Sequence, residues 1–288
     1  MKKIVILGGS GFIGSHLADY LSQKNFKVTI FDLKKSKWKK NNQRMIVGDL
    51  LDIKKLDQAI KGSDIVYNFA AVANMDLLKD KAISTVKYNI LGTVNALEVS
   101  RKYKIKKFIH ASTIYANTEE GGFYGRSKKA AEDYVEEYKK MFNLNYTILR
   151  FGSMYGDRSG NDNGMRQILK NLLLKKKLIY KGTVNSVRRY LYVKDAVKLC
   201  YQSMQKKFDN KYLILTGQKK IKAEFLFKML AKLFKVPKKN IKYLKNKGHY
   251  DIKPTPFKPR PGEYLLHNSS DFKKNIIEYV KKLKISKL

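Results

Sequence analysis

The first 150 residues alternate between short apolar runs and longer segments in which apolar residues recur every three or four positions. The longer segments, at 12–24, 53–60, 83–103 and 121–138, have the spacing of amphipathic helices. The short runs predict buried strands at 3–7, 27–32, 45–49, 64–70, 106–112 and 145–151. Strands that alternate with helices form βαβ units with right-handed crossovers. The sequence therefore predicts an α/β fold with a doubly wound parallel sheet.

The rhythm changes after residue 160, and a smaller C-terminal α/β lobe is expected from there onward. Helices are predicted at 164–177, 194–204, 223–234 and 271–284, with strands at 178–182, 188–193 and 211–216. A proline-rich passage runs from Pro254 to Pro261. We expect one domain over 1–160 and a second over 161–288, with the chain crossing between them near 187–206.

The chain is strongly basic, with 61 Lys and Arg against 24 Asp and Glu and a net charge of +37. Such a charge is typical of nucleic-acid binding. However, the lysines are spread along the whole chain, and only nine of the basic residues are Arg, the usual reader of bases. We therefore expect a lysine-rich, solvated surface and no specific nucleic-acid partner. Its positive field should attract anionic ligands such as nucleotide diphosphates.

The apolar run near the N-terminus is short, because Gly8 and Gly9 interrupt it, so it predicts a buried strand and not a signal sequence. No apolar run reaches the roughly 18 residues that a membrane span requires. Cys200 is the single cysteine and permits no internal disulfide. The four histidines show no metal-binding spacing, so no metal is expected. These features favour a cytoplasmic protein that does not insert into a membrane.

The segment "GGSGFIG" follows the first predicted strand and opens the first predicted helix. Glycine is needed where the backbone turns tightly and approaches a pyrophosphate. The helix N-terminus adds N–H groups and the positive end of its dipole. In this strand–turn–helix context the motif predicts a dinucleotide site on a Rossmann-type sheet. The expected cofactor contacts are Gly8, Gly11, Phe12, Ile13 and Gly14.

Asp32 closes the second predicted strand, 18 residues beyond the last glycine of the motif, where an acid would bind the adenosine ribose hydroxyls. A carboxylate there repels a 2′-phosphate, which favours NAD over NADP, although Lys34 and Lys35 could host such a phosphate. Asp49 and Leu50 follow the third strand and are expected to flank the adenine. For Asp49, a helix cap is an equal alternative.

Tyr124 and Lys128 lie four residues apart in the helix that follows the fifth predicted strand, so their side chains share one face. The pKa of a free phenol is about 10. A neighbouring ammonium stabilises the phenolate and lowers that pKa, which suits Tyr124 to acid–base catalysis. Ser112 ends the strand 106–112, at the carboxyl edge where ligands bind in such sheets.

Seven segments occur in a familiar order along the chain: "GGSGFIG", "GDLLD", "NFAA", "HASTIYA", "YGRSK", "LRFGSMYG" and "RRYLYVKDA". Together they resemble the extended short-chain dehydrogenases/reductases, and within these the NAD-dependent epimerase/dehydratase family, which acts on nucleotide sugars. The resemblance covers nearly the whole chain and is strong through about residue 200. It implies NAD as the cofactor, a nucleotide-diphosphate sugar as the substrate, and a second lobe that binds the sugar nucleotide.

The resemblance assigns roles to the residues at the catalytic edge. Tyr124 would be the acid–base, Lys128 its partner and a ligand of the nicotinamide ribose, and Ser112 the hydroxyl that orients the substrate. The serine segment is one residue shorter than in many members, because "ST" leads directly into "IYA", so Thr113 is an alternative to Ser112. Further cofactor contacts are implied in the loop after the fourth strand, at Phe69, Ala70 and Ala71.

Weaker correspondences concern the substrate and the assembly. Asn89 matches a helix position near the active site, and Ser153 stands where many relatives have an Asn facing the substrate pyrophosphate. Arg188 matches an arginine that holds the nucleotide diphosphate with its fork of donors, and Arg189 could substitute for it. Family members form dimers through two long helices, which implies a homodimer through segments 83–103 and 124–142.

The resemblance also bears on the reaction. Dehydratases of this branch follow the Ser or Thr with Asp-Glu, whereas Ile114 and Tyr115 follow here. Base-driven epimerase/reductases use a cysteine and a histidine near the site, and Cys200 lies in a later predicted helix. We therefore expect a 4-epimerase that oxidises the sugar C4 hydroxyl through Tyr124 and returns hydride to the opposite face. A 4-dehydrogenase, a decarboxylase and a non-catalytic NAD-binding regulator stay open.

Overall fold

A computed structural model describes all residues except 74–80, 119, 245–261, 266–269 and 284–288. The chain divides into two compact units. Unit 1 comprises Met1–Phe151, Ala196–Leu215 and Pro254–Leu265, and unit 2 comprises Gly152–Asp195, Thr216–Lys253 and Leu266–Leu288. The chain therefore first leaves unit 1 after residue 151, earlier than the expected 160, and it returns at residue 196. The proline-rich passage from Pro254 to Pro261 lies outside the described residues.

Unit 1 is built on an eight-stranded parallel sheet in the order β14-β11-β6-β5-β4-β1-β2-β3. This confirms the predicted α/β fold with a parallel Rossmann-type sheet. The strand expected at 211–216 in the second domain lies here as β11, because its apolar residues are buried beside β6. The strands are β1 Lys3–Leu7, β2 Lys27–Asp32, β3 Gln43–Val47, β4 Ile65–Asn68, β5 Lys107–Thr113, β6 Tyr146–Phe151, β11 Lys211–Leu215 and β14 Glu263–Tyr264.

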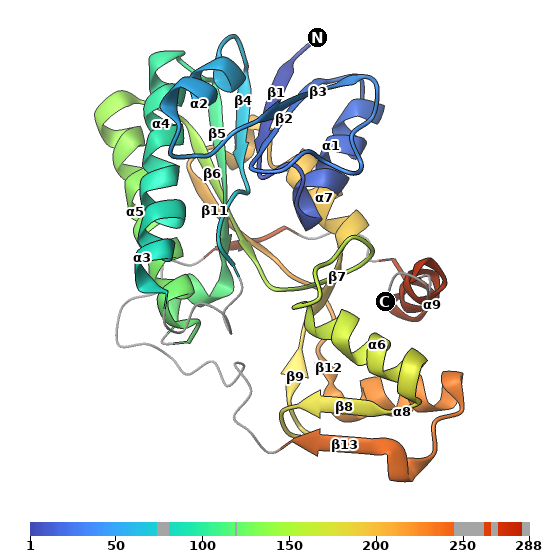
Figure 1. The fold of residues 1–288 in the computed structure, drawn as a ribbon. Helices are drawn as coiled ribbons and strands as arrows, with labels where there is room; N and C mark the ends of the chain where they lie inside the picture. The colour runs from blue at the N-terminus through green and yellow to red at the C-terminus, as the bar shows by residue number, and fades with distance from the viewer. Residues whose placement is uncertain (74–80, 119, 245–261, 266–269, 284–288) are drawn as a thin grey trace. The chain divides into compact units, whose positions relative to one another are not determined.

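Helices cover both faces of this sheet, with α2, α4 and α5 on one side and α1 and α7 on the other (Figure 1). The single helix expected at 83–103 is instead three segments, because a π-helical stretch separates α3 from α4. Such stretches often mark functional sites. The bounds are α1 Phe12–Gln23, α2 Ile53–Ile60, α3 Ala82–Thr85, η1 Val86–Leu91, α4 Gly92–Lys102, η2 Ile114–Asn117, α5 Gly122–Phe142 and α7 Val193–Gln202.

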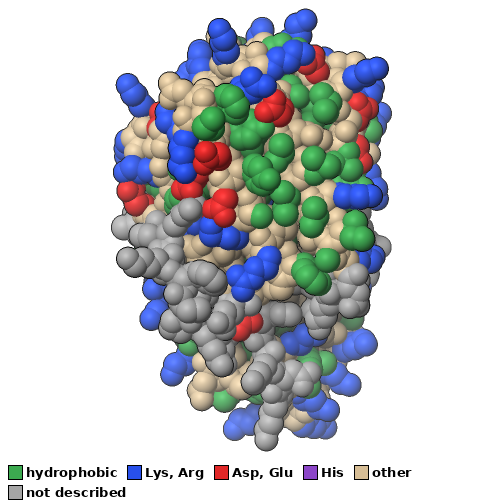
Figure 2. All heavy atoms as spheres, turned by 90° about the vertical axis from the view of Figure 1, so that its left-hand side faces the viewer, with side chains coloured by type: hydrophobic (Ala, Val, Ile, Leu, Met, Phe, Trp, Pro, Cys, Tyr) green, Lys and Arg blue, Asp and Glu red, His purple; other side chains and the backbone are tan. Residues whose placement is uncertain are grey.

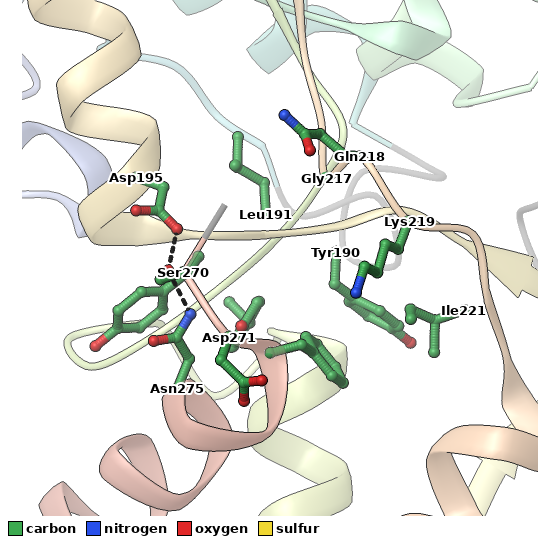
Figure 3. Close-up of a pocket in the computed structure, with 13 residues that line it drawn as sticks. Tyr190, Leu191, Asp195, Gly217, Gln218, Lys219, Ile221, Ser270, Asp271 and Asn275 are labelled. Carbon is green, nitrogen blue, oxygen red and sulfur yellow. Dashed lines mark hydrogen bonds between the residues drawn. The ribbon is translucent and has the colours of Figure 1, made fainter. Parts of the chain in front are cut away.

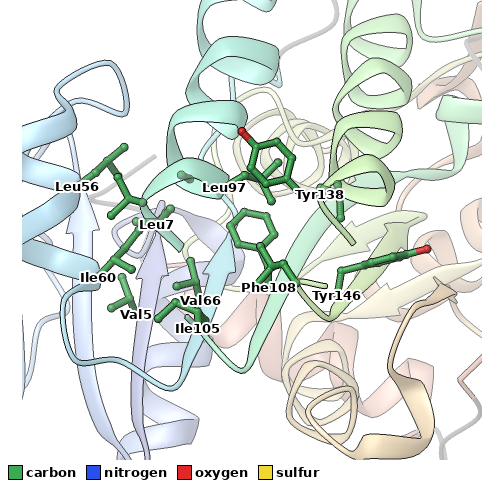
Figure 4. Close-up of a cluster of buried hydrophobic side chains, with 14 of the residues drawn as sticks. Val5, Leu7, Leu56, Ile60, Val66, Leu97, Ile105, Phe108, Tyr138 and Tyr146 are labelled. Carbon is green, nitrogen blue, oxygen red and sulfur yellow. The ribbon is translucent and has the colours of Figure 1, made fainter. Parts of the chain in front are cut away.

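The main apolar core of unit 1 lies between the sheet and helices α2, α4 and α5 (Figure 4). Val66 on β4 and Phe108 on β5 are fully buried there, against Leu97 of α4 and Val135 of α5. Every residue of β5 is buried, as expected for a central strand of a covered parallel sheet. The core therefore fixes β5 and α5, which carry the predicted catalytic residues, and β4, which precedes the predicted cofactor loop.

The described residues of unit 2 form three two-stranded sheets and three α-helices. Among the described residues, no helix of either unit is long and apolar enough to span a membrane. The paired strands are β7 Ser153–Tyr155 with β10 Tyr190–Tyr192, β8 Leu178–Lys181 with β13 Ile241–Leu244, and β9 Val187–Arg188 with β12 Ile221–Lys222. The helices are α6 Gly164–Lys175, α8 Ala223–Phe234 and α9 Phe272–Lys282.

Candidate active site

The glycine-rich turn between β1 and α1 is packed too tightly for side chains. Gly8 has φ +80, and a Cβ there would lie 2.5 Å from the backbone N of Ala70. A Cβ on Gly14, in the first turn of α1, would lie 2.3 Å from the Gly8 carbonyl oxygen. The N-cap of α1 is Gly11, and no side chain caps the helix. The turn therefore presents backbone N–H groups at a helix N-terminus, the arrangement that binds a pyrophosphate; Phe12 and Ile13 open this helix.

Asp32 lies at the end of β2 beside this turn. Its Oδ2 accepts a hydrogen bond of 2.9 Å from the Ser10 N–H, and the Ser10 hydroxyl donates to the Lys34 carbonyl at 2.8 Å. The carboxylate thus holds the glycine-rich turn against the end of β2. This places an acid where the sequence predicts the adenosine ribose.

Asp49 lies in the segment after β3, where the sequence left a helix cap open as an alternative to an adenine contact. Its Oδ1 accepts from the Leu51 N–H at 2.9 Å, which forms a local turn. The cap of α2 is Asp52, whose Oδ1 accepts from the Lys55 N–H at 3.1 Å, so Asp49 is not the helix cap. Leu50 is 5% exposed and belongs to the core, so its side chain packs inward beneath the segment.

The loop after β4 lies against the glycine-rich turn, as the close approach of Ala70 to Gly8 shows. Phe69 extends the strand pairing by donating its N–H to the Leu7 carbonyl at 2.8 Å. Its ring packs edge-on against Phe151 at 6.0 Å. Phe69, Ala70 and Ala71 are half-buried, and they continue the wall that starts at the turn.

Asn89 is completely buried in the π-helical stretch. Its side chain accepts from the Val72 N–H at 2.8 Å and donates to the Val72 carbonyl at 3.0 Å. It also donates to the Ser127 hydroxyl at 2.9 Å, and Ser127 in turn bonds the Tyr124 carbonyl. Asn89 therefore connects the β4 loop to the first turns of α5. Both polar atoms of its side chain are therefore engaged by protein groups, and its predicted contact with the substrate stays a prediction.

Tyr124, near the start of α5, is hydrogen-bonded to the side chain of Thr113. Burial raises the pKa of Tyr124 to about 12, and the bond to Thr113 opposes that rise. The Thr113 Oγ1 also accepts from the Tyr115 N–H at 3.3 Å, which leaves its O–H free to donate to the phenol. Ser112 is 3% exposed, and its hydroxyl has no partner within the described residues. Thr113, the alternative that the sequence leaves open, is thus the hydroxyl bonded to Tyr124, and the choice between Ser112 and Thr113 as the substrate-orienting hydroxyl stays a prediction.

Lys128 lies one turn further along α5 and is 2% exposed. Burial lowers the pKa of Lys128 to about 8, and the neighbouring Glu132 opposes that change. Its Nζ has no hydrogen-bond partner among the described residues. A buried ammonium without a partner is costly, so this geometry points to a group that binds there.

A buried polar cluster extends behind Lys128. Asn68 donates to the Thr93 hydroxyl at 3.0 Å, and its Nδ2 lies 3.4 Å from Nδ1 of His110. Because an amide nitrogen only donates, the His110 Nδ1 accepts and the ring proton sits on Nε2. Burial, together with the charge of Lys128, holds the pKa of His110 well below its usual value, so the ring is neutral.

A buried ion pair lies one turn beyond Lys128 on the same helix. Glu132 is completely buried and accepts from Nε and Nη2 of Arg150, at 2.9 and 2.7 Å. The guanidinium also lies over the ring of Tyr212 at 4.2 Å. This two-point contact ties α5 to β6 directly beneath the catalytic face.

The remaining predicted residues lie in unit 2 or in the core. Ser153 starts β7, and Arg188 on β9 donates from Nε to the Tyr180 hydroxyl at 2.9 Å. Arg189 donates to the Gln218 carbonyl at 2.8 Å. Cys200 is fully buried in α7, and burial raises the pKa of its thiol far above the usual value. Within the described residues, no group of His, Cys, Asp and Glu is arranged to hold a metal.

Unit 1 therefore contains a tight glycine turn, an acid at the end of β2, a tyrosine bonded to a threonine side chain, and a buried lysine one turn further along the same helix. The family profile described as "NAD dependent epimerase/dehydratase family" matches residues 4–214. The chain belongs to this family. The family is NAD-dependent, so the predicted resemblance is confirmed at this level.

Several members and related structures are similar over most of the chain. A Methanocaldococcus jannaschii protein named "Putative UDP-glucose 4-epimerase" is 33% identical over 218 residues, covering 68% of this chain and 71% of that protein. A dTDP-D-glucose 4,6-dehydratase of Dictyostelium discoideum is 32% identical, covering 68% of this chain and 54% of that protein. A UDP-glucose 4-epimerase structure from Thermotoga maritima has a TM-score of 0.84 at 24% identity, covering 99% of this chain and 100% of that chain.

Sequence reasoning missed three features of this epimerase/dehydratase site. One is the contact between Thr113 and Tyr124, although the shortened "ST" segment already makes Thr113 an alternative to Ser112. Another is Glu132, although Tyr124, Lys128 and Glu132 recur at four-residue steps and so share one side of α5. The last is the contact of His110 with Asn68, which depends on the pairing of β4 with β5. No local pattern signals that contact.

Proposed function

We propose that the protein is an NAD-dependent nucleotide-sugar 4-epimerase. The observation that carries this proposal is the group formed by Tyr124, Thr113 and Lys128, with no carboxylate acid–base pair in the segment after Thr113. Ile114 and Tyr115 occupy that segment, and the thiol of Cys200 is fully buried. The similarity to the Methanocaldococcus protein also supports this choice.

The residues present fit a dinucleotide. The turn from Gly8 to Gly14 would hold the pyrophosphate, and Asp32 would hold the adenosine ribose. The unpartnered Nζ of Lys128 would donate to the nicotinamide ribose hydroxyls. When bound, NAD supplies a hydride acceptor that can return the hydride to either face of a sugar ketone. The carboxylate of Asp32, which would repel a 2′-phosphate, favours NAD over NADP.

Proton transfer belongs to Tyr124. A phenol with a pKa of about 12 is almost fully protonated at neutral pH, so the folded chain alone does not supply a phenolate. In the proposed mechanism, the ammonium of Lys128 and the O–H of Thr113 would stabilise the phenolate once substrate and cofactor are bound. Tyr124 would take the proton from the sugar C4 hydroxyl during oxidation and give it back when the ketone is reduced. In unit 2, Arg188 and Ser153 are proposed to bind the substrate diphosphate, for which a guanidinium is suited.

A panel of nucleotide sugars tests the reaction. The purified protein is incubated with UDP-, GDP- and dTDP-sugars, and proton NMR follows the anomeric and C4 signals. A 4-epimerase gives an equilibrium mixture of two C4 epimers with no net consumption of added NAD. A stable 4-keto product would support a dehydrogenase or dehydratase, and loss of CO₂ from a uronic acid would support a decarboxylase. No conversion of any sugar, with NAD still bound, would support a regulator.

We also propose a homodimer formed through α4 and α5. Figure 2 looks onto this side of unit 1 and shows apolar side chains gathered between charged ones. Leu91 at the end of η1 and Met141 and Phe142 at the end of α5 are exposed, with 66% exposure for Met141. Light scattering should show twice the chain mass of 33.4 kDa, and Met141→Glu should reduce it to the monomer. The control Leu174→Glu, an exposed leucine of α6, should stay dimeric. A monomeric wild type would contradict the proposal.

A further inference from the structure

Unit 2 contains a cavity of about 1020 Å³ that the proposed reaction does not use. Among the described residues, its lining comes from β12 and the residues before it, α8, and the start of α9, all within unit 2. Neither Ser153 nor Arg188 lines it. The volume is at the upper end of the range for cavities that enclose a single organic ligand.

The apolar part of this cavity is a second face of α8. One face of the helix is core, since Leu226 and Leu230 are fully buried. Phe225, Met229 and Leu233 recur every four residues on another side and line the cavity. Phe225 is 57% exposed, and Met229 and Leu233 are half-buried, so the stripe keeps apolar surface open to the cavity. A large aromatic side chain in a cavity of this size offers contact area to an apolar ligand.

The polar part of the cavity is almost entirely cationic. Five of its eleven described lining residues are lysines, and the single acid is Asp271. Asp271 already caps α9, because its Oδ1 accepts from the Lys274 N–H at 2.8 Å. None of the five ammonium groups makes an ion pair within the described part of the chain. The lysines are Lys219, Lys220, Lys222, Lys232 and Lys273.

A smaller cavity of about 220 Å³ adjoins the large one and shares Lys219, Ile221, Asp271 and Phe272 with it (Figure 3). Its walls are more polar. Ser270 donates to the buried carboxylate of Asp195 and accepts from Asn275 at 2.6 Å. These groups bond one another, so they form a fixed wall. The cationic groups that can meet a ligand are therefore those of the large cavity.

We propose that the large cavity binds an amphiphilic anion, a molecule with an apolar or aromatic body and one carboxylate, sulfonate or phosphate head. The Phe225–Met229–Leu233 stripe covers the body, and the surrounding ammonium groups neutralise the head. The occupant is a single free molecule and not a bilayer, because the apolar side chains line a hollow. This site is independent of the proposed epimerase reaction.

The first experiment titrates the full-length, NAD-loaded protein with 8-anilinonaphthalene-1-sulfonate, whose fluorescence rises in apolar sites. Laurate should displace the probe, whereas the uncharged analogue 1-dodecanol should do so about tenfold less well, because it cannot use the lysines. Equal displacement by both, or none by either, would overturn the proposal. Circular dichroism before and after titration checks that the chain stays folded.

Matched variants locate the site. Phe225→Gln and the double change Lys222→Gln/Lys232→Gln should each weaken laurate binding by about tenfold. The control Lys238→Gln/Lys239→Gln removes the same charge from exposed positions of unit 2 outside the cavity, and should change binding less than about twofold. Equal losses in both double variants would show unspecific charge attraction instead. Binding to phosphatidylglycerol vesicles that is lost in Phe225→Gln, with no binding of free laurate, would assign the surface to a membrane and overturn the proposal.

Discussion

Replacing Thr113 by valine removes one hydroxyl from the end of β5 and keeps the branched shape of the side chain. The structure gives that hydroxyl two bonds, one to Tyr124 and one from the Tyr115 N–H at 3.3 Å. Ser112, its neighbour, has a buried hydroxyl without a partner in the described chain. The two residues should therefore respond in opposite ways to loss of the hydroxyl.

Two separate effects follow from the Thr113→Val change. The phenolate of Tyr124 loses a donor, and loss of one such donor at a reacting oxygen typically lowers kcat by about 10²–10³-fold. The Tyr115 N–H loses its acceptor at the start of η2, which costs about 1–2 kcal/mol of stability. Ser112→Ala removes an unpaired hydroxyl, so we expect kcat within a few-fold of wild type and unchanged or higher stability.

The assay measures kcat and KM on the nucleotide sugar found by NMR, with urea unfolding and bound-NAD content measured on the same samples. Thr113→Ser keeps the hydroxyl and should restore most of the activity, which separates the hydroxyl from the shape of the side chain. If Ser112→Ala loses activity by two orders of magnitude while Thr113→Val stays active, the assignment of the orienting hydroxyl made here is wrong.

Three further changes probe the same helix. Tyr124→Phe should lower kcat by about 10²–10⁴-fold while the bound-NAD content is kept. The control Tyr134→Phe, at an exposed position of the same helix, should leave kcat unchanged. Normal turnover in Tyr124→Phe would reject the acid–base role. Lys128→Met should abolish turnover yet raise the free energy of unfolding at pH 7, by up to roughly 3 kcal/mol, because burial lowers the lysine pKa from 10.5 to about 8. Between pH 8 and pH 10.5 Lys128 is mostly protonated in the unfolded wild type and mostly neutral in the folded wild type, so the free energy of unfolding of the wild type rises with pH in this range. The extra stability of the variant over the wild type should therefore vanish by pH 10.5. Urea titrations in which this extra stability stays constant with pH would contradict the reasoning. Glu132→Gln should cost about 3–5 kcal/mol by removing the carboxylate that the buried guanidinium of Arg150 contacts at two points. The double change Glu132→Gln/Arg150→Met should recover part of that loss in urea unfolding, and additive losses would argue against a coupled pair.

Much of unit 1 could be predicted because its signals are local. The apolar runs of β1 and β5 and the amphipathic spacing of α1 and α5 each identify an element without reference to the rest of the chain. The glycine-rich turn is equally local, since its requirement for a missing Cβ can be read from the glycine residues in their strand–turn–helix context. Family resemblance then supplied the roles of Tyr124 and Lys128.

The parts that could not be predicted depend on long-range pairing. Nothing in the sequence "KYLIL" tells whether that strand joins the large sheet or the second domain, and its neighbour β6 lies more than 60 residues earlier in the chain. The π-helical stretch around Asn89 has an ordinary helical pattern, and its insertion is visible only in the backbone. The choice between Ser112 and Thr113 was also beyond the sequence, because neighbouring strand residues differ only in the direction in which they point.

Buried polar groups without hydrogen-bond partners distinguish the residues of unit 1 that are expected to meet a ligand from the residues that hold them in place. The supporting contacts are complete, since Glu132 and Arg150 satisfy each other and Asn89 bonds both the β4 loop and Ser127. The buried groups of unit 1 without partners in the described chain belong to Asn68, His110, Ser112 and Lys128, and the ammonium of Lys128 is the costliest of them to leave unpaired. Each lowers stability, and a fold selected for stability alone would remove them. The surrounding residues have complete hydrogen bonds, so they hold these groups in fixed positions where a ligand can meet them. The residues that lower the free energy of unfolding most are therefore the ones to test for function.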